Sequence, residues 1–336
     1  MAIRIAINGF GRIGRNVLRA AWDDPQVEFV HINDLTSDDM LAYLLKNDSV
    51  HGRWGHDVKA VDGGISIDGK VIPTSAERSP AALPWKQAEV DVVLECTGVF
   101  TNGDKARAHI EAGAKKVIIS APGTNVDGTF VVGVNDDQLD PATCHVVSNA
   151  SCTTNCLAPP VKVIVETCGI KRGLMTTIHS YTMDQNLLDA PHPGGKFRRA
   201  RAAALNMVPT STGAAKAIGL VIPELKGKLD GLAIRVPTPN VSLVDLVFES
   251  ERPTTAEELN AAFRAAAAGP LKGILEATDE PLVSGDLCGN PHSSIIDLAL
   301  TSVNDGTMVK ILAWYDNEWG FSNRMVSLSK LLMGVR

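Results

Sequence analysis

Short apolar runs separated by helical patterns dominate the first part of the chain. Ile3–Ile7 is a run typical of a buried strand, and Val17, Leu18 and Ala21 then recur at the spacing of a helix. The same succession continues with apolar runs at 27–32, 90–94, 117–119 and 146–147 and a helical pattern at 105–112. Alternating strands and helices predict an α/β domain built on a doubly wound parallel sheet.

A different pattern interrupts this succession. Three short alternating segments, at 58–61, 65–67 and 70–72, are separated by the turn-forming pairs Gly63-Gly64 and Asp68-Gly69. This pattern predicts a small antiparallel meander inserted into the domain.

The pattern changes again after residue 150. Longer strand-like runs follow at 174–180, 232–236, 241–248 and 309–315. They predict a second, α+β domain with a mostly antiparallel sheet, so we expect domains at 1–150 and 151–316. The segment 181–211 is predicted to be a long loop, and loops of this length inside a compact domain are usually functional.

The turn after the first strand carries a glycine motif. Gly9, Gly11 and Gly14 have the GxGxxG spacing between a strand and a helix, and Asp34 follows the second strand about 20 residues later. Glycines there permit a tight turn and a close approach of a pyrophosphate, and the acidic side chain can accept hydrogen bonds from a ribose. We therefore predict a Rossmann-type domain that binds a dinucleotide.

Cys152 is the first candidate for chemistry. It follows an apolar strand and a polar turn and precedes the helical pattern of Leu157 and Val161. The start of a helix favours an anion, so a thiol there is expected to ionise more easily and to act as a nucleophile. Ser151 and Thr153 add hydroxyls suited to an oxyanion or a phosphate. Alternatively, one of these hydroxyls caps the helix and Cys152 is a small buried residue.

His179 is the best candidate for a base among the eight histidines. It ends the strand-like run 174–180, where strand ends face a common cleft, and polar residues follow it. A histidine beside a cysteine is the arrangement that activates a thiol. A structural histidine in the core is the alternative.

Composition and charge narrow the class of protein. The net charge is -6 with a pI near 5.8, which argues against a nucleic-acid or membrane-surface protein. The chain lacks an apolar stretch of about 18 residues and begins with a strand pattern, so we expect a cytoplasmic protein. The six cysteines are spaced irregularly, which is typical of a reducing compartment. Cys152 and Cys156 would share a helix face, but no histidine lies at metal-ligand spacing, so we predict no metal site.

Several blocks along nearly the whole chain match one family. They are Ile7–Arg15, Ala150–Cys156, His179–Thr182, Pro209–Lys216, Arg235–Ser242 and Trp314–Gly320. On these motifs the chain resembles the phosphorylating glyceraldehyde-3-phosphate dehydrogenase family. The resemblance implies that Cys152 attacks the aldehyde of glyceraldehyde 3-phosphate, that His179 accepts a proton as hydride leaves for NAD, and that inorganic phosphate attacks the resulting thioester to give 1,3-bisphosphoglycerate.

The resemblance also implies two phosphate subsites. One would hold the substrate phosphate with Thr182 and Arg235, near Asp184. The other would hold the attacking phosphate with Ser151, Thr153, Arg201, Thr212 and Gly213. For the basic run that includes Arg198, Arg199 and Arg201, a solvated charge cluster is the alternative.

The cofactor implied is NAD, since the Asp34 carboxylate would repel a 2′-phosphate. The matching positions expected to contact it are Gly9, Gly11, Arg12, Ile13, Gly14, Asp34, Arg78, Thr97, Ser120 and Asn317. The resemblance further implies a homotetramer and a C-terminal helix, 317–336, that joins the first domain.

Some positions depart from the family pattern. Met183 stands where asparagine is usual, the linker at 193–197 is two residues longer, and Ala190-Pro191 is a mixed cofactor signature. Two other functions stay open: an erythrose-4-phosphate dehydrogenase, and a nucleotide-binding protein of this fold without catalysis.

Overall fold

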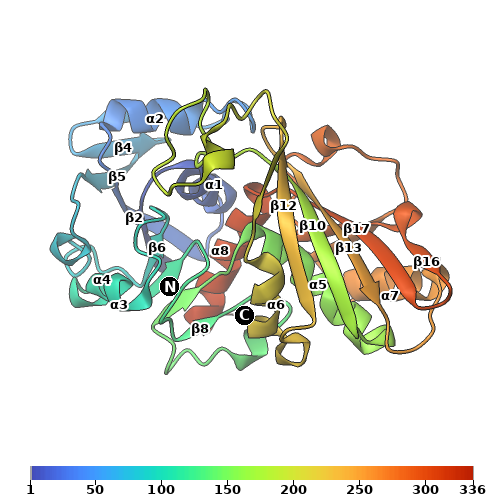
Figure 1. The fold of residues 1–336 in the computed structure, drawn as a ribbon. Coiled ribbons are helices and arrows are strands. Elements are labelled where there is room, and N and C mark those ends of the chain that lie inside the picture. The colour runs from blue at the N-terminus through green and yellow to red at the C-terminus, as the bar shows by residue number, and fades with distance from the viewer. Residues whose placement is uncertain (1, 336) are drawn as a thin grey trace. The chain divides into compact units, whose positions relative to one another are not determined.

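The computed structural model describes residues 2–335, and these divide into two compact units. The first unit runs to Val132 and includes Asp136–Ser151 and the chain from Ser322 onward. The second unit comprises Gly133–Asn135 and Cys152–Phe321. Each unit is built on its own sheet (Figure 1). The predicted fold class is confirmed, because one sheet is largely parallel and the other mostly antiparallel.

The first unit alternates strands and helices as the apolar pattern predicts. Its elements are β1 (Ile3–Asn8), α1 (Arg12–Ala21), β2 (Val27–Asn33), α2 (Asp38–Lys46), β3 (Val58–Val61), β4 (Gly64–Ile67), β5 (Lys70–Ser75), β6 (Val92–Glu95), α3 (Gly103–Ala106), α4 (Ala108–Glu111), β7 (Lys116–Ile119), β8 (Gly128–Thr129) and β9 (Val146–Ser148).

The sheet of this unit has the strand order β3-β4-β5-β2-β1-β6-β7-β9-β8. Strand β1 pairs in parallel with both β2 and β6, and the order reverses at this strand. The predicted meander exists as β3, β4 and β5, which pair antiparallel. It also extends the main sheet, because β5 pairs in parallel with β2. Ligands of open α/β sheets bind beyond the carboxyl ends of strands at such a reversal.

The helix predicted at 105–112 is wrong in its bounds. It begins earlier, because the Asn102 side chain accepts hydrogen bonds from the amides of Asp104 (2.9 Å) and Lys105 (3.3 Å) and caps α3. It is also interrupted at Arg107, so α3 and α4 are separate short helices.

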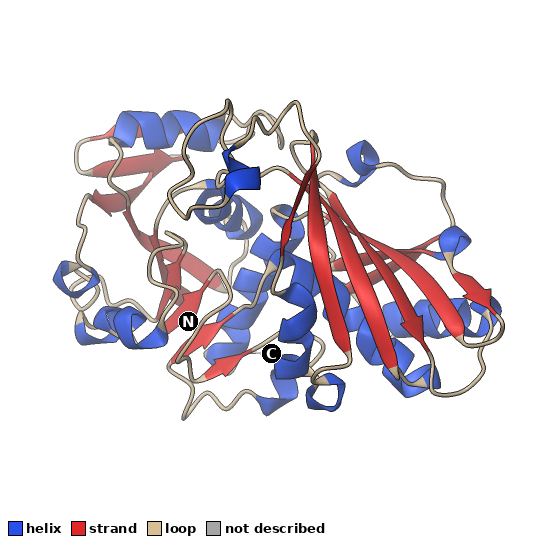
Figure 2. Cartoon of the chain, in the orientation of Figure 1, coloured by secondary structure: helices blue, strands red, loops and turns tan. Residues whose placement is uncertain are grey.

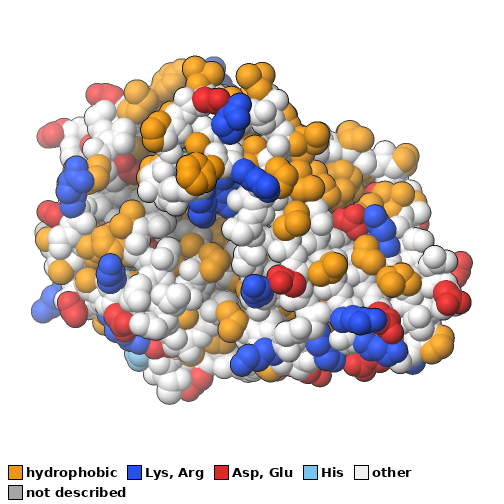
Figure 3. All heavy atoms as spheres, viewed as in Figure 1, with side chains coloured by type: hydrophobic (Ala, Val, Ile, Leu, Met, Phe, Trp, Pro, Cys, Tyr) orange, Lys and Arg blue, Asp and Glu red, His pale blue; other side chains and the backbone are white. Residues whose placement is uncertain are grey.

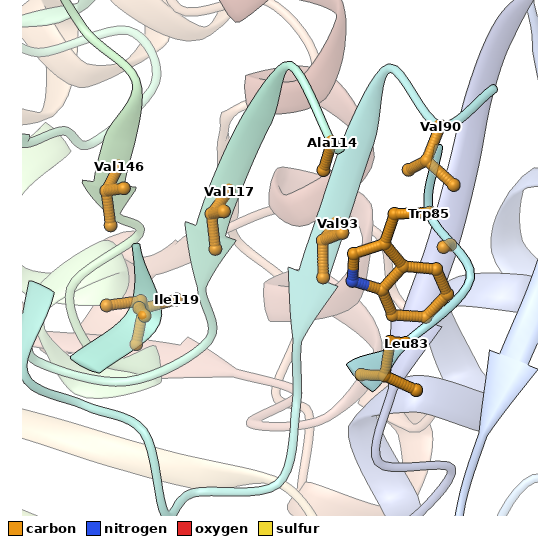
Figure 4. Packing of buried hydrophobic residues seen from close by; sticks show 10 residues of the cluster. Leu83, Trp85, Val90, Val93, Ala114, Val117, Ile119 and Val146 are labelled. Atoms are coloured by element: carbon orange, nitrogen blue, oxygen red, sulfur yellow. The ribbon is translucent and has the colours of Figure 1, made fainter. Parts of the chain in front are cut away.

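One hydrophobic cluster of this unit packs between β6, β7, β9 and the segment before β6. Figure 4 shows the Trp85 ring beside Leu83, Val90 and Val93. Val117, Ile119 and Val146 continue the cluster along the sheet, and all of these side chains are buried. Burial of a tryptophan is favourable only when its indole N–H has a partner.

The second unit contains α5 (Cys152–Cys168), β10 (Arg172–Ser180), β11 (Val208–Ser211), α6 (Ala214–Val221), β12 (Leu229–Val236), β13 (Ser242–Glu249), α7 (Ala256–Ala268), β14 (Leu275–Thr278), β15 (Ser294–Asp297), β16 (Ser302–Asn304) and β17 (Met308–Tyr315). Its sheet has the order β11-β12-β10-β13-β17-β15-β14, and β16 pairs with β17.

Most pairs in this second sheet are antiparallel, and its long strands fan out in Figure 2. The exceptions are β10 with β12 and β14 with β15. Alternate residues of β13 are buried, as expected for a strand with one face on a core. Helix α5 packs against α6, α7 and strands β15 and β17.

The segment 181–211 is not a loop throughout. It contains a short 3-10 helix at Phe197–Ala200, and its last residues form β11, which pairs with β12. The loop prediction is therefore wrong for 208–211. This strand contains Pro209, and proline is tolerated there because β11 is at an edge of its sheet.

The last helix, α8, covers Trp319–Leu332. It begins two residues later than predicted, because the Asp316 carboxylate accepts hydrogen bonds from the amides of Glu318 (2.9 Å) and Trp319 (2.7 Å). Near its other end Lys330 Nζ lies 2.5 Å from Asp24 Oδ2 and donates to the Gln26 side chain (2.8 Å), both in the first unit. Across residues 2–335, none of the helices has the length and apolar character needed to cross a membrane.

Candidate active site

Cys152 is the first residue of α5, directly after a strained turn. Ala150, two residues earlier, has a φ of 56°, in the left-handed region that non-glycine residues rarely adopt. Strain of this kind persists only where the surrounding structure enforces it, and it is common at active sites. The turn therefore fixes where the thiol stands.

His179 lies beside this thiol. It is near the end of β10 and only 6% exposed, and its Nε2 is 3.6 Å from Cys152 Sγ. Its Nδ1 is 2.6 Å from the Ser180 carbonyl oxygen, which can only accept a hydrogen bond. Nδ1 therefore carries the proton in the neutral ring, and Nε2 faces the sulfur as an acceptor.

The ionisation of this pair differs from the expectation for a helix start. Burial raises the pKa of the Cys152 thiol, and hydrogen bonds from Thr153 together with the positive charge of Arg235 oppose this only in part. Burial likewise lowers the pKa of His179 to about 4. The prediction of an acidified thiol is wrong, because desolvation raises its pKa by more than the hydrogen bonds and the charge of Arg235 lower it. Burial therefore favours the uncharged form of both groups.

Tyr315, at the end of β17, contacts the His179 ring and Thr153, the residue after Cys152. The sequence analysis did not single it out. Its hydroxyl is 2.9 Å from Thr153 Oγ1 and 2.8 Å from Thr177 Oγ1. Its ring meets the His179 ring edge-on, with centroids 5.9 Å apart. A buried tyrosine needs a hydrogen-bond partner for its hydroxyl. Tyr315 ends the apolar run 309–315, and this run was the sequence signal that could have pointed to a buried tyrosine.

A cationic cluster forms on the same sheet. Arg235 is the register partner of His179 on the neighbouring strand β12. Its Nη1 donates to Thr182 Oγ1, to Asp184 Oδ1 (2.9 Å) and to Gln185 Oε1 (3.2 Å). The sheet thus brings together the predicted residues Thr182, Asp184 and Arg235.

Arg199 completes this cluster, so the alternative of a solvated charge cluster is wrong for Arg199, while Arg198 and Arg201 are exposed. It is 8% exposed, pairs with Asp184 Oδ2, and donates to Thr210 Oγ1 (3.0 Å). Although burial opposes the effect, the hydrogen bond from Thr182 and the charges of Arg235 and Arg199 lower the pKa of Asp184. Two guanidinium groups sharing one carboxylate leave a net positive charge that suits an anion.

The predicted second phosphate subsite is not assembled in the same way. Arg201 Nε is bound to Asp189 Oδ2 at 2.7 Å in an exposed ion pair, and the Thr153 hydroxyl is bonded to Tyr315. Thr212 Oγ1 accepts from the Ala214 amide (3.2 Å) at the start of α6, beside the exposed Gly213. Arg201 and Thr153 therefore have protein partners where the prediction gave them a phosphate.

The glycine turn of the first unit fits a dinucleotide. Gly9 has a φ of 91°, and a Cβ there would lie 2.7 Å from the Thr97 amide nitrogen. A Cβ on Gly14 would lie 2.4 Å from the Gly9 carbonyl oxygen, whereas Gly11 faces open space. Asp34 Oδ2 accepts a hydrogen bond from the Phe10 amide (2.7 Å), which brings the acidic side chain to the turn. Gly9 and Gly14 thus allow the turn to pack closely, and Gly11 leaves space for a ligand. A pyrophosphate bound at a helix start requires both features.

The other predicted cofactor contacts vary in their surroundings. Arg12 pairs with Asp48 (2.5 Å), whose pKa hydrogen bonds lower to about 2 despite its burial. Arg78 is exposed, while Ile13 and Ser120 are half-buried. Asn317 is buried in the second unit, where its Oδ1 accepts from the hydroxyls of Ser180 (2.8 Å) and Ser242 (3.0 Å). This orients its amide group.

Comparison with known proteins gives two family-model matches. Residues 3–103 match the model described as glyceraldehyde 3-phosphate dehydrogenase, NAD binding domain, and residues 151–317 match the C-terminal domain of the same name. Among similar proteins, glyceraldehyde-3-phosphate dehydrogenase 1 of Bacillus subtilis (strain 168) is 60% identical over 329 residues, 98% of each chain. The glyceraldehyde-3-phosphate dehydrogenases of Geobacillus stearothermophilus (59% over 329 residues, 98% of each chain) and Cereibacter sphaeroides (58% over 338 residues, 99% of this chain and 100% of the other) are similar throughout.

Proposed function

Because the chain belongs to the glyceraldehyde-3-phosphate dehydrogenase family of NAD-dependent oxidoreductases, we propose that it converts glyceraldehyde 3-phosphate and inorganic phosphate to 1,3-bisphosphoglycerate. The observation that carries the proposal is the 3.6 Å approach of Cys152 Sγ to an accepting His179 Nε2. A thiol with a base in this position can react covalently with an aldehyde.

In the first step the Cys152 thiol gives its proton toward His179 Nε2 while Sγ forms a bond to the aldehyde carbon. The C=O π bond breaks, and the oxygen takes a proton from His179 to give a thiohemiacetal. The accepting Nε2 lies 3.6 Å from Sγ, so it can take the thiol proton as the sulfur attacks.

In the second step His179 Nε2 accepts the hydroxyl proton as the carbon is oxidised to a thioester. NAD, when bound, supplies the two-electron acceptor for the hydride that this oxidation releases. Inorganic phosphate then forms the new C–O bond, the C–S bond breaks, and Cys152 is regenerated. The thioester retains part of the free energy of oxidation for the acyl phosphate.

The cluster of Arg235, Thr182 and Arg199 would hold the substrate phosphate, with Asp184 keeping both guanidinium groups in place. For the attacking phosphate we propose Ser151, Thr153, Thr212 and Gly213, with Arg201 exchanging its ion pair with Asp189 for the phosphate. For NAD we propose the glycine turn, Arg12, Ile13, Arg78, Thr97 and Ser120, with Asp34 on the adenosine ribose and Asn317 on the carboxamide.

We further infer a homotetramer in the cytoplasm, with domains at 1–150 plus 317–336 and at 151–316. The assembly is supported by exposed apolar side chains concentrated in one segment of the second unit, namely Leu187, Leu188, Phe197, Leu205 and Met207. Figure 3 shows hydrophobic side chains at the surface among charges of both signs. Apolar side chains gathered in this way favour a protein interface.

The test is NADH formation from glyceraldehyde 3-phosphate, measured with and without inorganic phosphate. We expect turnover that depends on phosphate and is abolished in Cys152→Ser. A Cys168→Ser variant, which changes a buried cysteine at the other end of α5, is the matched control and should stay active. Faster turnover of erythrose 4-phosphate, or no effect of phosphate, would contradict the proposal.

A further inference from the structure

A buried carboxylate lies at the carboxyl end of β6, beneath the glycine turn. Glu95 is 1% exposed and accepts hydrogen bonds from Asn8 Nδ2 (2.6 Å) and His109 Nε2 (3.1 Å) on one oxygen. Its other oxygen accepts from the Thr97 amide (2.9 Å) and from the Thr97 hydroxyl. The mechanism above does not use this group.

The orientation of His109 is imposed by a tryptophan. Trp85 Nε1 lies 2.9 Å from His109 Nδ1, and both residues are fully buried. An indole N–H can only donate, so His109 Nδ1 accepts and Nε2 carries the proton that points to Glu95. The Trp85 ring is itself held by the hydrophobic cluster of Figure 4. Every group around the carboxylate is thus a donor.

The same network reaches the end of β2. Asn33 Nδ2 donates to Asn8 Oδ1 (2.7 Å), and Asn33 Oδ1 accepts from Ser75 Oγ (2.8 Å). The Asn33 carbonyl accepts from the Gly9 amide (2.8 Å), and Asp34 follows directly. Hydrogen bonds therefore join Glu95 to the glycine turn and to the strand end that carries Asp34.

The segment that Glu95 holds is in contact with the turn. The backbone of residues 96–97 lies so near Gly9 that a Cβ there would be 2.7–2.8 Å away. Thr97 is exposed and Glu95 is buried, so the hydrogen bonds between them attach a surface segment to the core. A shift of this segment would change the shape of the glycine turn.

We propose that Glu95 is a positioning residue for cofactor binding, which holds Thr97 and Asn8 so that the glycine turn is preformed for the dinucleotide. This rests on the proposed binding of NAD at that turn. A preformed site binds its ligand more tightly, because the unfavourable free energy of ordering the site does not reduce the free energy of binding. The turn would otherwise have to become ordered as NAD binds.

The experiment compares wild type with Glu95→Gln, Thr97→Val and the double variant, in the full-length protein. In Glu95→Gln an amide NH₂ replaces one oxygen and must face donors, either at Thr97 or at Asn8 and His109. We expect the Kd for NAD, measured by calorimetry, to rise about tenfold, and the turnover number at saturating NAD to stay unchanged. Because Thr97 is itself a proposed NAD contact, the Thr97→Val and double variants are compared with Glu95→Gln by hydrogen exchange of the NAD-free protein. There the double variant should exchange no faster at 96–99 than Glu95→Gln, because both changes remove the same interaction.

A second readout needs no cofactor. Hydrogen exchange of the amides of 96–99 in the NAD-free protein should be faster in Glu95→Gln and in Thr97→Val. The matched control is Asp297→Asn, a buried carboxylate of the second unit that accepts from the Trp314 indole (3.2 Å). It should lower thermal stability without changing exchange at 96–99 or the Kd for NAD.

A Glu95→Gln protein with lowered stability but wild-type affinity and exchange would overturn the inference and leave the proposed function intact. If Glu95→Gln does not fold, the exposed Thr97→Val variant decides: unchanged exchange at 96–99 overturns the inference. A wild-type protein that does not bind NAD would overturn the proposed function and this inference together.

Discussion

The pKa of His179 makes a pH-dependent contribution to stability. Burial lowers this pKa to about 4, from 6.5 for an unperturbed histidine. The ring is therefore neutral in both folded and unfolded protein above about pH 7. As the pH falls, the unfolded chain binds a proton before the folded one does, so folding becomes less favourable.

The size of the effect follows from the shift. A difference of about 2.5 pKa units corresponds to roughly 3 kcal/mol, of which about 2 kcal/mol is already lost at pH 5. His179→Gln removes this titration and keeps a polar side chain. We expect the free energy of unfolding of wild type, relative to His179→Gln, to fall by these amounts as the pH drops from 7 toward 4.

Urea titrations of the NAD-free protein at several pH values, at one protein concentration, measure this difference. Changes in other groups cancel in the comparison, because both proteins carry them. A difference between the two proteins that stays constant from pH 7 to pH 4 would show that His179 is not a buried, neutral base.

Three further outcomes follow from the site. Tyr315→Phe should lower the free energy of unfolding by about 1–3 kcal/mol in urea titrations, because Thr153 and Thr177 lose their shared hydroxyl partner. Arg235→Lys should raise the KM for glyceraldehyde 3-phosphate by about 10- to 100-fold in steady-state assays, with the Kd for NAD unchanged, because a lysine cannot offer a phosphate the planar pair of N–H donors of a guanidinium group. Asp34→Asn should reduce the preference for NAD over NADP in a comparison of kcat/KM, because the repelling charge is removed.

The first two of these outcomes have a matched control. Tyr43→Phe changes an exposed tyrosine and should leave stability unchanged. Arg172→Lys changes an exposed arginine of β10 and should leave the KM for the aldehyde unchanged. An unaltered KM in Arg235→Lys, or an unaltered cofactor preference in Asp34→Asn, would remove the corresponding contact from the proposed site.

The place of Cys152 at the start of a helix and the glycine turn could be predicted because their signals are local. Gly9, Gly11 and Gly14 act through the backbone of one strand, turn and helix, and Cys152 follows a strand that leads into a helix. Such short-range patterns depend on residues close in sequence. The sequence also predicted that the second sheet is mostly antiparallel, since its strands are long and alternate in polarity.

Other features depend on pairs far apart in the chain. Arg199 belongs to a basic run whose sequence suggests an exposed segment. It is nevertheless buried, because it forms an ion pair with Asp184. Tyr315 is 162 residues from Thr153, and Glu95 is 87 residues from Asn8. Sequence patterns carry no information on such pairings, because they arise only when separate strands come into register.

The amino-acid sequence alone thus determined the two kinds of sheet, where the thiol and the glycines stand, and to which family the chain belongs. The tertiary structure decided the surroundings that shift the pKa of that thiol and of its base. The helix start predicted an acidic Cys152, whereas packing around it and around His179 removes water and favours the neutral forms. Desolvation depends on everything that surrounds a group in space, and that is set only by the fold.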